Sequence, residues 1–255
     1  MSGTVLLTVK IIAVFAASYL LGSIQPSYIL GKRLKHVDIR DFGSGNSGAT
    51  NAIRVFGIRF GISCLLIDAA KGAVAILIAK YVFGPSVVEP SISLILQLLS
   101  GLCVILGHNH PFYMDFQGGK GIAASIGVLL TIDYRLLFYA GIPAIIILIV
   151  FRYMSVASLS FEFLSFVAIT ALNFKSGHFY WIAITAALFP IIAFYRHKAN
   201  IKRLANGTEP KLWTKKSDLK NDSGKEDYEK AVENLEEVEK KEEPEEPEDT
   251  SEKNE

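Results

Sequence analysis

The feature that most constrains this chain is a series of long apolar runs, separated by short polar segments, that fills most of the sequence before residue 200. A helix needs about 20 mainly apolar residues to cross a bilayer, and several of the runs reach or approach that length. The fourth run is short for a full crossing, which indicates irregular backbone that is buried in protein or lines a wet cavity. The sequence therefore predicts an all-α, polytopic integral membrane protein with about seven transmembrane helices, near residues 4–30, 60–83, 91–113, 119–131, 135–151, 156–173 and 178–195.

Charge divides the chain into two unlike parts. Residues 1–213 carry 18 Lys and Arg against 8 Asp and Glu, whereas residues 214–255 carry 8 Lys against 17 acidic side chains. We expect a membrane-embedded domain over 1–213. Over 214–255 we expect an acidic, Glu/Lys-rich, disordered cytoplasmic tail, because it has too few apolar residues to fold; its partner is unknown. The two cysteines both lie in apolar runs and provide neither a disulfide framework nor metal-ligand spacing.

Lysine and arginine in the loops predict the orientation in the membrane. The loop 31–59 carries six of them, the next loop, 84–90, carries none, and the segment after the last run is again basic. With seven spans, this places the N-terminus outside and the C-terminus in the cytoplasm. The cytoplasmic side is then shared by the segment that begins at Arg196 and by the loops 31–59, 114–120 and 152–155.

The richest polar segment on that side is the glycine-, serine- and asparagine-rich stretch DIRDFGSGNSGATNAIRVFG, residues 38–57. Glycine lets backbone N–H groups approach an anion closely, and Arg54 can hold a phosphate through two parallel hydrogen bonds. It is not a Walker A loop, because Gly-Lys-Ser/Thr does not follow at the required spacing. We predict a phosphate-binding loop rather than a plain basic linker, with the candidate residues Gly43, Ser44, Gly45, Asn46, Gly48, Thr50, Asn51 and Arg54.

A second glycine-rich segment, QGGKG, comes directly before the fourth apolar run. Gly118, Gly119 and Gly121 surround Lys120 at the point where a helix is expected to start. Free N–H groups at a helix N-terminus, together with a lysine, form a ready anion site. The alternative is a lysine that ends a loop at the membrane surface.

Two further pairs of polar residues flank the last two runs. Ser155 and Ser158 are three residues apart, as are His197 and Asn200, so each pair shares one helical face. Small hydroxyl residues in membrane helices usually serve packing, and a histidine in a basic juxtamembrane segment usually just lies at the interface. Both pairs nevertheless fall on the same side as the two loops. Together these segments predict one site that binds anionic oxygen groups beside lipid.

Charged residues also occur inside the apolar runs. Asp68 and Lys71 are three residues apart, and ionisable groups in a span are costly and usually paired toward the interior. We predict an internal ion pair that holds the fold and supports the site indirectly; Glu162 is a similar case without an obvious partner. His110 and Asp115 have the H-x-x-x-x-D spacing of acyltransferases that use acyl-CoA or acyl carrier protein, and we interpret this as a chance match.

Several blocks together resemble those of the acyl-phosphate:glycerol-3-phosphate acyltransferases, the PlsY family. Over about residues 22–212 they are, in order, GSIQPSYILGK, GSGNSGATNAIR, DAAKG, GH..P followed by GGKG, RYMSVAS and RHKANIKRL. The resemblance implies seven helices in the bacterial cytoplasmic (inner) membrane, an active site on the cytoplasmic side, and no cofactor or metal. It also implies transfer of a fatty acyl group from acyl phosphate to the 1-position of sn-glycerol 3-phosphate. The products are lysophosphatidic acid and phosphate, in the first acylation step of phospholipid synthesis, with no acyl-enzyme.

The resemblance also implies roles for particular residues. The polar set that binds glycerol 3-phosphate and the donor would be Ser44, Arg54, Lys120, Ser158, His197 and Asn200, supported by Asp68, Lys71, Ser155 and His108. Whether His197 acts as a base or only binds is left open. Gln117 stands where lysine is expected before the glycine pair, which removes a charge near the phosphate. The expected partners are acyl phosphate, glycerol 3-phosphate and membrane lipids, with no nucleic acid.

Two other classes of function fit the sequence less well. A transporter for an organic phosphate needs access from both sides of the membrane and often has repeated halves with interrupted helices. This chain shows no internal repeat, and its polar residues fall on one side. A membrane scaffold that recruits partners through its tail would not need the glycine-rich loops.

Overall fold

The computed structural model describes residues 3–84 and 87–212, and the regular structure within these ranges is entirely helical. Five of the described helices are long and apolar enough to cross a membrane: α1 (Gly3–Ser23), α4 (Ile58–Val82), α5 (Pro90–Asn109), α8 (Met154–Leu172) and α9 (Phe179–Arg196). The fourth and fifth predicted runs form shorter apolar helices: α6 (Ile122–Ile132), and a π-helical turn η2 (Leu137–Gly141) that continues into α7 (Ile142–Phe151). The all-helical membrane fold is thus confirmed. The seven-span topology stays a prediction, and the predicted tail, 214–255, lies outside the described residues.

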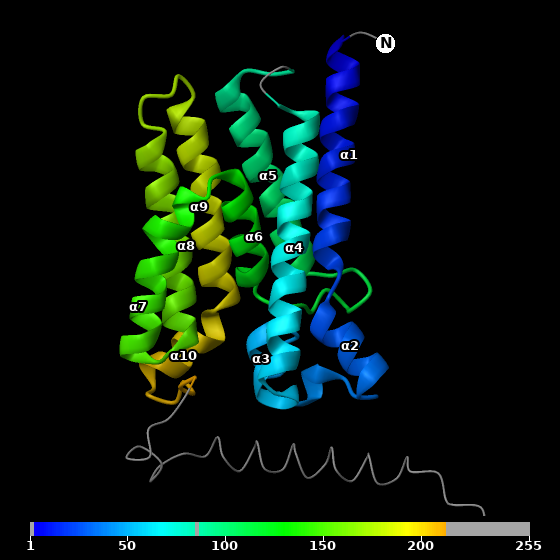
Figure 1. Cartoon of the computed structure of the whole chain (residues 1–255), viewed down its shortest axis with the longest axis vertical. Helices are drawn as coiled ribbons and strands as arrows, with labels where there is room; N and C mark the ends of the chain where they lie inside the picture. The colour runs from blue at the N-terminus through cyan, green and yellow to red at the C-terminus, as the bar shows by residue number, and fades with distance from the viewer. Residues whose placement is uncertain (1–2, 85–86, 213–255) are drawn as a thin grey trace, which may run out of the picture.

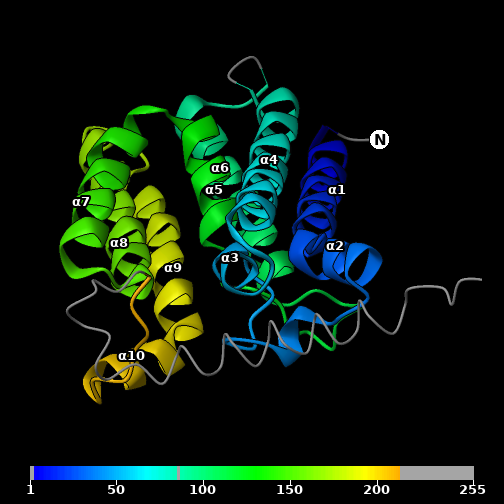
Figure 2. The ribbon, with the colours of Figure 1, turned by 60° about the horizontal axis from the view of Figure 1, so that its bottom comes forward.

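Three short helices gather at one end of the bundle, opposite the N-terminal end of α1 (Figures 1 and 2). They are α2 (Pro26–Leu34), α3 (Ala49–Phe56) and α10 (Lys198–Ala205), and the 3-10 turn η1 (Ile39–Asp41) lies between the first two in the chain. The polar segments next to these short helices therefore lie at the same end of the molecule, although they are far apart in sequence.

The first predicted span, 4–30, is two helices rather than one, so its predicted length was wrong. Proline has no N–H group, so Pro26 cannot donate to the carbonyl of Gly22, four residues earlier. The ammonium of Lys71 takes that role, because its Nζ lies 2.8 Å from the carbonyl oxygen of Gly22 and 2.5 Å from that of Ile24. A buried lysine of α4 thus satisfies the helix break.

Glycines let neighbouring helices approach closely. A Cβ atom at Gly72 of α4 would lie 2.3 Å from the carbonyl oxygen of Ala124 in α6, and one at Gly22 of α1 would lie 2.1 Å from that of Val104 in α5. In lipid, close packing of small residues takes over much of the role that the hydrophobic effect plays in water. These contacts fix α4 against α6 and α1 against α5.

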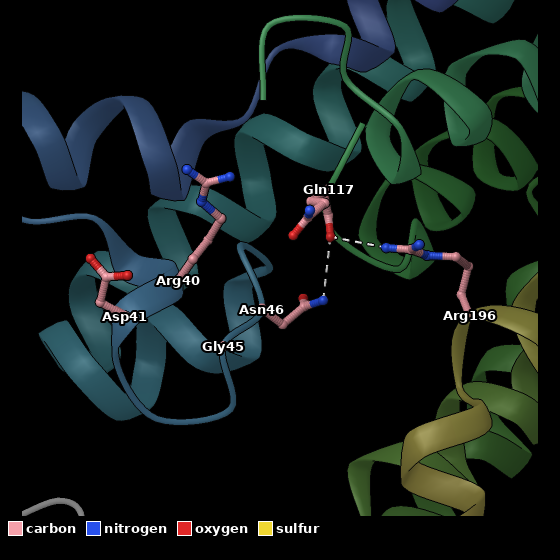
Figure 3. Close-up of a pocket in the computed structure, with 7 residues that line it drawn as sticks. Arg40, Asp41, Gly45, Asn46, Gln117 and Arg196 are labelled. Carbon is pink, nitrogen blue, oxygen red and sulfur yellow. Dashed lines mark hydrogen bonds between the residues drawn. The ribbon is translucent and has the colours of Figure 1, made fainter. Parts of the chain in front are cut away.

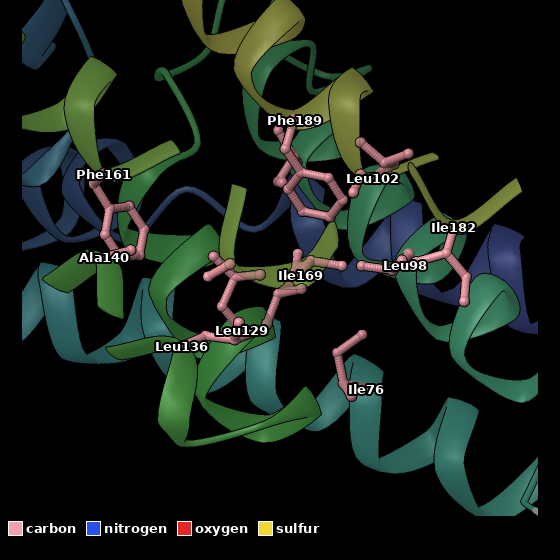
Figure 4. Packing of buried hydrophobic residues seen from close by; sticks show 14 of the residues in the cluster. Ile76, Leu98, Leu102, Leu129, Leu136, Ala140, Phe161, Ile169, Ile182 and Phe189 are labelled. Carbon is pink, nitrogen blue, oxygen red and sulfur yellow. The ribbon is translucent and has the colours of Figure 1, made fainter. Parts of the chain in front are cut away.

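The main apolar core lies between α5, α6, α8 and α9 (Figure 4). Leu98, Leu129, Ile169 and Phe189 are among its buried members. Many other large apolar side chains point outward from the bundle instead. A water-soluble protein rarely exposes apolar surface on this scale, so the outer face suits lipid. The core holds the helices whose ends carry the polar loops.

Candidate active site

The first glycine-rich loop is folded around the side chain of Asn51, which is buried in the first turn of α3. The amide nitrogen of Asn51 donates to the carbonyl oxygens of Ile39 (3.2 Å) and Phe42 (3.0 Å). Its amide oxygen accepts from the N–H group of Ser44 (2.9 Å). Gly43 has a φ of +60°, and a Cβ atom there would lie 2.4 Å from the same amide oxygen, so glycine is required. Asn51, predicted to contact substrate, serves in this structure to shape the loop.

Five of the backbone amides that we expected to face an anion have partners inside the protein. Their peptide N–H groups donate to side-chain or carbonyl oxygens of nearby residues, so these five amides do not point at a ligand. The bonds run from Ser44 to Asn51, from Gly45 to Phe42, from Gly48 to Asn46, from Gly118 to Asn109 and from Gly119 to His108.

The two loops meet beside the end of α9 (Figure 3). The side-chain nitrogen of Asn46 donates to the carbonyl oxygen of Gly118 (3.4 Å), and Arg196 donates to the carbonyl oxygens of Gly118 (3.1 Å) and Gly119 (2.8 Å). The predicted phosphate loops therefore border one polar cavity. Its volume is about 480 Å³, and its lining residues are Arg40, Asp41, Gly45, Asn46, Gln117, Gly118 and Arg196.

Lys120 reaches from the second loop to the segment after α9. Its Nζ donates to the side-chain oxygen of Asn200 (2.6 Å), and the nitrogen of Asn200 donates to Glu209 Oε1 (2.7 Å). The other oxygen of the buried Glu209 accepts from Arg203 Nε (2.8 Å). These four residues form one network, in which the predicted site residues Lys120 and Asn200 are in direct contact. We did not predict Glu209; its only signal is that it is the single acidic residue in the basic segment 195–212.

Burial and neighbouring charges shift the protonation of this cluster. Burial, with Arg203 and Arg54 nearby, lowers the pKa of the Lys120 ammonium to about 8, and the Glu209 carboxylate opposes the shift. Burial also lowers the pKa of the Arg54 guanidinium. Burial alone would raise the pKa of Glu209, but hydrogen bonds from Asn200 and Arg203 lower it. Arg54 and Lys120 are therefore close enough to interact and form part of a cationic site.

His197 is buried at the junction of α9 and α10 and is neutral at physiological pH. Burial and the nearby charge of Lys120 lower the pKa of its imidazole to about 4. Its Nδ1 atom lies 2.8 Å from the carbonyl oxygen of Ala193, which can only accept, so we place the ring proton on Nδ1. Nε2 then keeps its lone pair. His197 can accept a hydrogen bond from a hydroxyl group but is a weak base.

The predicted hydroxyl residues lie at different depths. Ser158 and Ser155 are buried near the start of α8, whereas Ser44 is exposed on its loop. Among the described residues, Ser158 makes no hydrogen bond with Lys120, so the structure does not by itself join it to the cationic cluster. Glu162 is buried one turn further along α8, and its Oε2 atom has no hydrogen-bond partner within the described ranges.

The predicted ion pair is confirmed, because Lys71 Nζ lies 2.8 Å from Asp68 Oδ1. The Nδ1 atom of His108 lies 3.3 Å from the same oxygen and so joins the pair. His110 bonds to the carbonyl oxygen of Phe116 (3.0 Å), which agrees with a chance H-x-x-x-x-D match. Within residues 3–84 and 87–212, histidine, cysteine, aspartate and glutamate side chains form no group of three or more that could hold a metal ion.

Sequence comparison connects this arrangement to known proteins. Residues 12–207 match the family model for glycerol-3-phosphate acyltransferase. A glycerol-3-phosphate acyltransferase from Shouchella clausii is 43% identical over 209 residues, which cover 81% of this chain and 98% of the relative. One from Thermoanaerobacter pseudethanolicus is 36% identical over 198 residues, which cover 78% of this chain and 93% of the relative.

Two solved structures share the fold. The crystal structure of PlsY, an integral membrane glycerol 3-phosphate acyltransferase, in its glycerol 3-phosphate form aligns with a TM-score of 0.68 at 31% identity, covering 79% of this chain and 94% of that one. Its lysophosphatidic acid form aligns with a TM-score of 0.66 at 30% identity, with the same coverage. These matches and the cationic site at the end of an apolar helix bundle show that this chain belongs to the glycerol-3-phosphate acyltransferase (PlsY) family.

Proposed function

We propose that this protein transfers a fatty acyl group from acyl phosphate to the 1-hydroxyl of sn-glycerol 3-phosphate at the cytoplasmic face of the bacterial inner membrane. The products are lysophosphatidic acid and phosphate, and the reaction is the first acylation of phospholipid synthesis. One observation carries the proposal: at the end of a lipid-facing bundle, beside two glycine-rich loops, Lys120 contacts Asn200 and lies within electrostatic range of Arg54 and of the neutral His197.

Arg54 and Lys120 are the groups that we assign to phosphate binding. A hydrogen bond to a charged group contributes about 1.5–3 kcal/mol, and the guanidinium can bind a phosphate through two parallel bonds. With a pKa of about 8, Lys120 is mostly cationic at pH 7, and a bound dianion would raise that pKa further. We assign Ser44, Thr50 and Ser158 as hydroxyl donors to the same substrates, with Asn200 orienting the Lys120 ammonium.

The acyl transfer is direct in our proposal. The 1-hydroxyl oxygen of glycerol 3-phosphate attacks the acyl carbonyl carbon, and the bond from that carbon to the phosphate oxygen breaks. An oxygen of the departing phosphate takes the hydroxyl proton, so atoms and charge balance without an acyl-enzyme. His197 accepts a hydrogen bond from the hydroxyl group and orients it. A pKa of about 4 makes it a poor general base at pH 7.

The proposed topology has seven membrane segments, with the N-terminus outside and the C-terminus in the cytoplasm. The basic loops support it through the positive-inside rule. The grouping of α2, α3 and α10 at one end of the bundle supports it as well (Figure 2). Single cysteines placed at Arg59 and Lys202, both exposed at that end, should react with an impermeant maleimide only in inside-out vesicles. Labelling of either one in right-side-out vesicles would refute the orientation.

The activity is tested with the purified full chain, palmitoyl phosphate and radiolabelled sn-glycerol 3-phosphate. We expect lysophosphatidic acid and inorganic phosphate in equal amounts, with the acyl group on position 1. Palmitoyl-CoA offered alone should give no product. Transfer from acyl-CoA, or phosphate release without lysophosphatidic acid, would contradict the proposed donor or acceptor.

A further inference from the structure

A cluster of three side chains outside the cationic site is buried where α1, α4 and α5 pack together. Asp68, Lys71 and His108 are 0%, 5% and 2% exposed, respectively. Lys71 Nζ lies 2.8 Å from Asp68 Oδ1 and 2.8 Å from His108 Nδ1. Charged groups inside a membrane protein are costly to bury unless they are paired and hydrogen-bonded. Because burying these groups costs free energy, we expect the cluster to have a role that apolar side chains could not perform.

One side of the cluster holds the break between α1 and α2. Lys71 donates to the carbonyl oxygen of Gly22, which Pro26 leaves without a helical donor, and to that of Ile24 inside the break. Gln25, inside the break, donates through its side chain to the carbonyl oxygen of His108 (2.7 Å). The break is therefore tied to α4 and to the end of α5 by polar contacts.

The other side of the cluster supports the second glycine-rich loop. The carbonyl oxygen of His108 accepts from the N–H group of Gly119 (3.0 Å), and that of Asn109 accepts from Gly118 (3.1 Å). The imidazole lies against Gly119 itself, since a Cβ atom there would be 2.0 Å from His108 Nε2. The next residue is Lys120. A shift of the imidazole would therefore move the backbone that carries the Lys120 side chain.

We propose that Asp68, Lys71 and His108 form a buried cluster that positions the loop carrying Lys120 for phosphate binding. They are positioning residues, because they act through the loop and do not touch substrate. The inference rests on the proposed function in one respect, the assignment of Lys120 to the substrate phosphate. Asp68 and Lys71 fix the His108 ring, and the ring fixes the position of Gly119.

The first test is a double-mutant cycle between His108→Ala and Lys120→Ala, with the KM for glycerol 3-phosphate as the readout. Each single variant should raise this KM about tenfold or more, because each deprives the phosphate of a correctly placed ammonium. The double variant should resemble Lys120→Ala alone, since a misplaced lysine and a missing one have the same effect. Additive increases in KM would overturn the proposal, because a general loss of stability acts whether or not Lys120 is present.

The second test uses size complementarity between the ring and the loop. Gly119→Ala should cut kcat/KM about tenfold or more, because its methyl group meets the imidazole. In the His108→Ala background the same methyl group fills the vacated space, so the double variant should be more active than Gly119→Ala. Gly177→Ala is the matched control, since a Cβ atom there meets nothing within 4 Å, and should match the wild type.

The outcomes separate the two proposals. Wild-type protein that makes no lysophosphatidic acid from acyl phosphate contradicts the proposed function and leaves KM undefined; binding of radiolabelled glycerol 3-phosphate then serves as the readout for the same cycles. Active wild-type protein with additive cycles and no rescue by His108→Ala refutes the positioning role alone. If His108→Ala fails to accumulate in membranes, a cycle of Gly119→Ala with Lys120→Ala replaces it. Increases in KM that are not additive then support the positioning role, and additive increases refute it.

Discussion

The pKa of Lys120 provides a direct test of its assignment to phosphate binding. The ammonium has a pKa of about 8 because of its burial, so it is charged below pH 8 and loses its charge as the pH rises through 8. The profile of kcat/KM reports groups of the free enzyme. We expect kcat/KM for glycerol 3-phosphate to be level from pH 7 to 7.5 and then to fall, approaching about tenfold per pH unit above the pKa. The substrate phosphate, whose second pKa is about 6, does not titrate in that range.

Two substitutions give the magnitude and the control. Lys120→Ala removes a charged hydrogen bond of about 1.5–3 kcal/mol, so kcat/KM should fall roughly 10- to 160-fold at pH 7. Lys120→Arg keeps a charge that does not titrate below pH 10, so its profile should stay level to pH 9.5, whatever activity it retains. Acyl phosphate hydrolysis without enzyme is subtracted at each pH. A wild-type profile that is level to pH 9.5, or the same inflection in Lys120→Arg, would refute the assignment.

Three further changes probe the remaining assignments. Arg54→Ala should lose roughly 10- to 160-fold in kcat/KM for glycerol 3-phosphate while accumulating normally in membranes. Arg54→Lys should recover only part of this kcat/KM, because lysine lacks the paired donors of the guanidinium. Full activity in Arg54→Ala would contradict a role in phosphate binding. His197→Gln should keep more kcat than His197→Ala, because its amide oxygen can accept the hydroxyl hydrogen bond. The pKa of His197 is about 4, so any inflection of kcat near pH 6, where the substrate phosphate titrates, should persist in His197→Gln; an inflection that this substitution abolishes would restore a base role. Ending the chain after Leu212 should leave turnover nearly unchanged when measured at equal amounts of membrane protein, and an inactive truncation would show that the acidic segment is needed.

Most of the fold could be predicted because bilayer crossing depends on composition and length alone. Apolar runs mark the long helices directly, and the shortness of α6 was visible in the length of its run. The ion pair of Asp68 and Lys71 followed from their helical spacing and from the cost of unpaired charge in lipid. The missing N–H group of Pro26 explains the break between α1 and α2, but the group that satisfies the freed carbonyl oxygens could not be predicted. That Lys71 would supply the missing donor depends on how α4 packs against α1.

For the candidate site, the sequence indicated which residues lie together better than it indicated the contacts that each one makes. Arg54, Lys120 and Asn200 could be named because cations and amides near glycine-rich loops indicate anion binding. The use of the loop amides could not be foreseen, because it depends on backbone dihedral angles that composition does not determine; Asn51 consequently braces a loop from within. Glu209 was missed because an acidic residue in a basic segment resembles an ordinary surface charge until the folded chain buries it beside Arg203.

Glu209 lies beyond the last membrane helix, at the far end of the described chain. The ribosome must therefore translate all of these helices before Asn200 and Arg203 receive the carboxylate that they share. A chain released before residue 209 would contain both glycine-rich loops and the cations Lys120 and Arg203 but would lack this counter-charge.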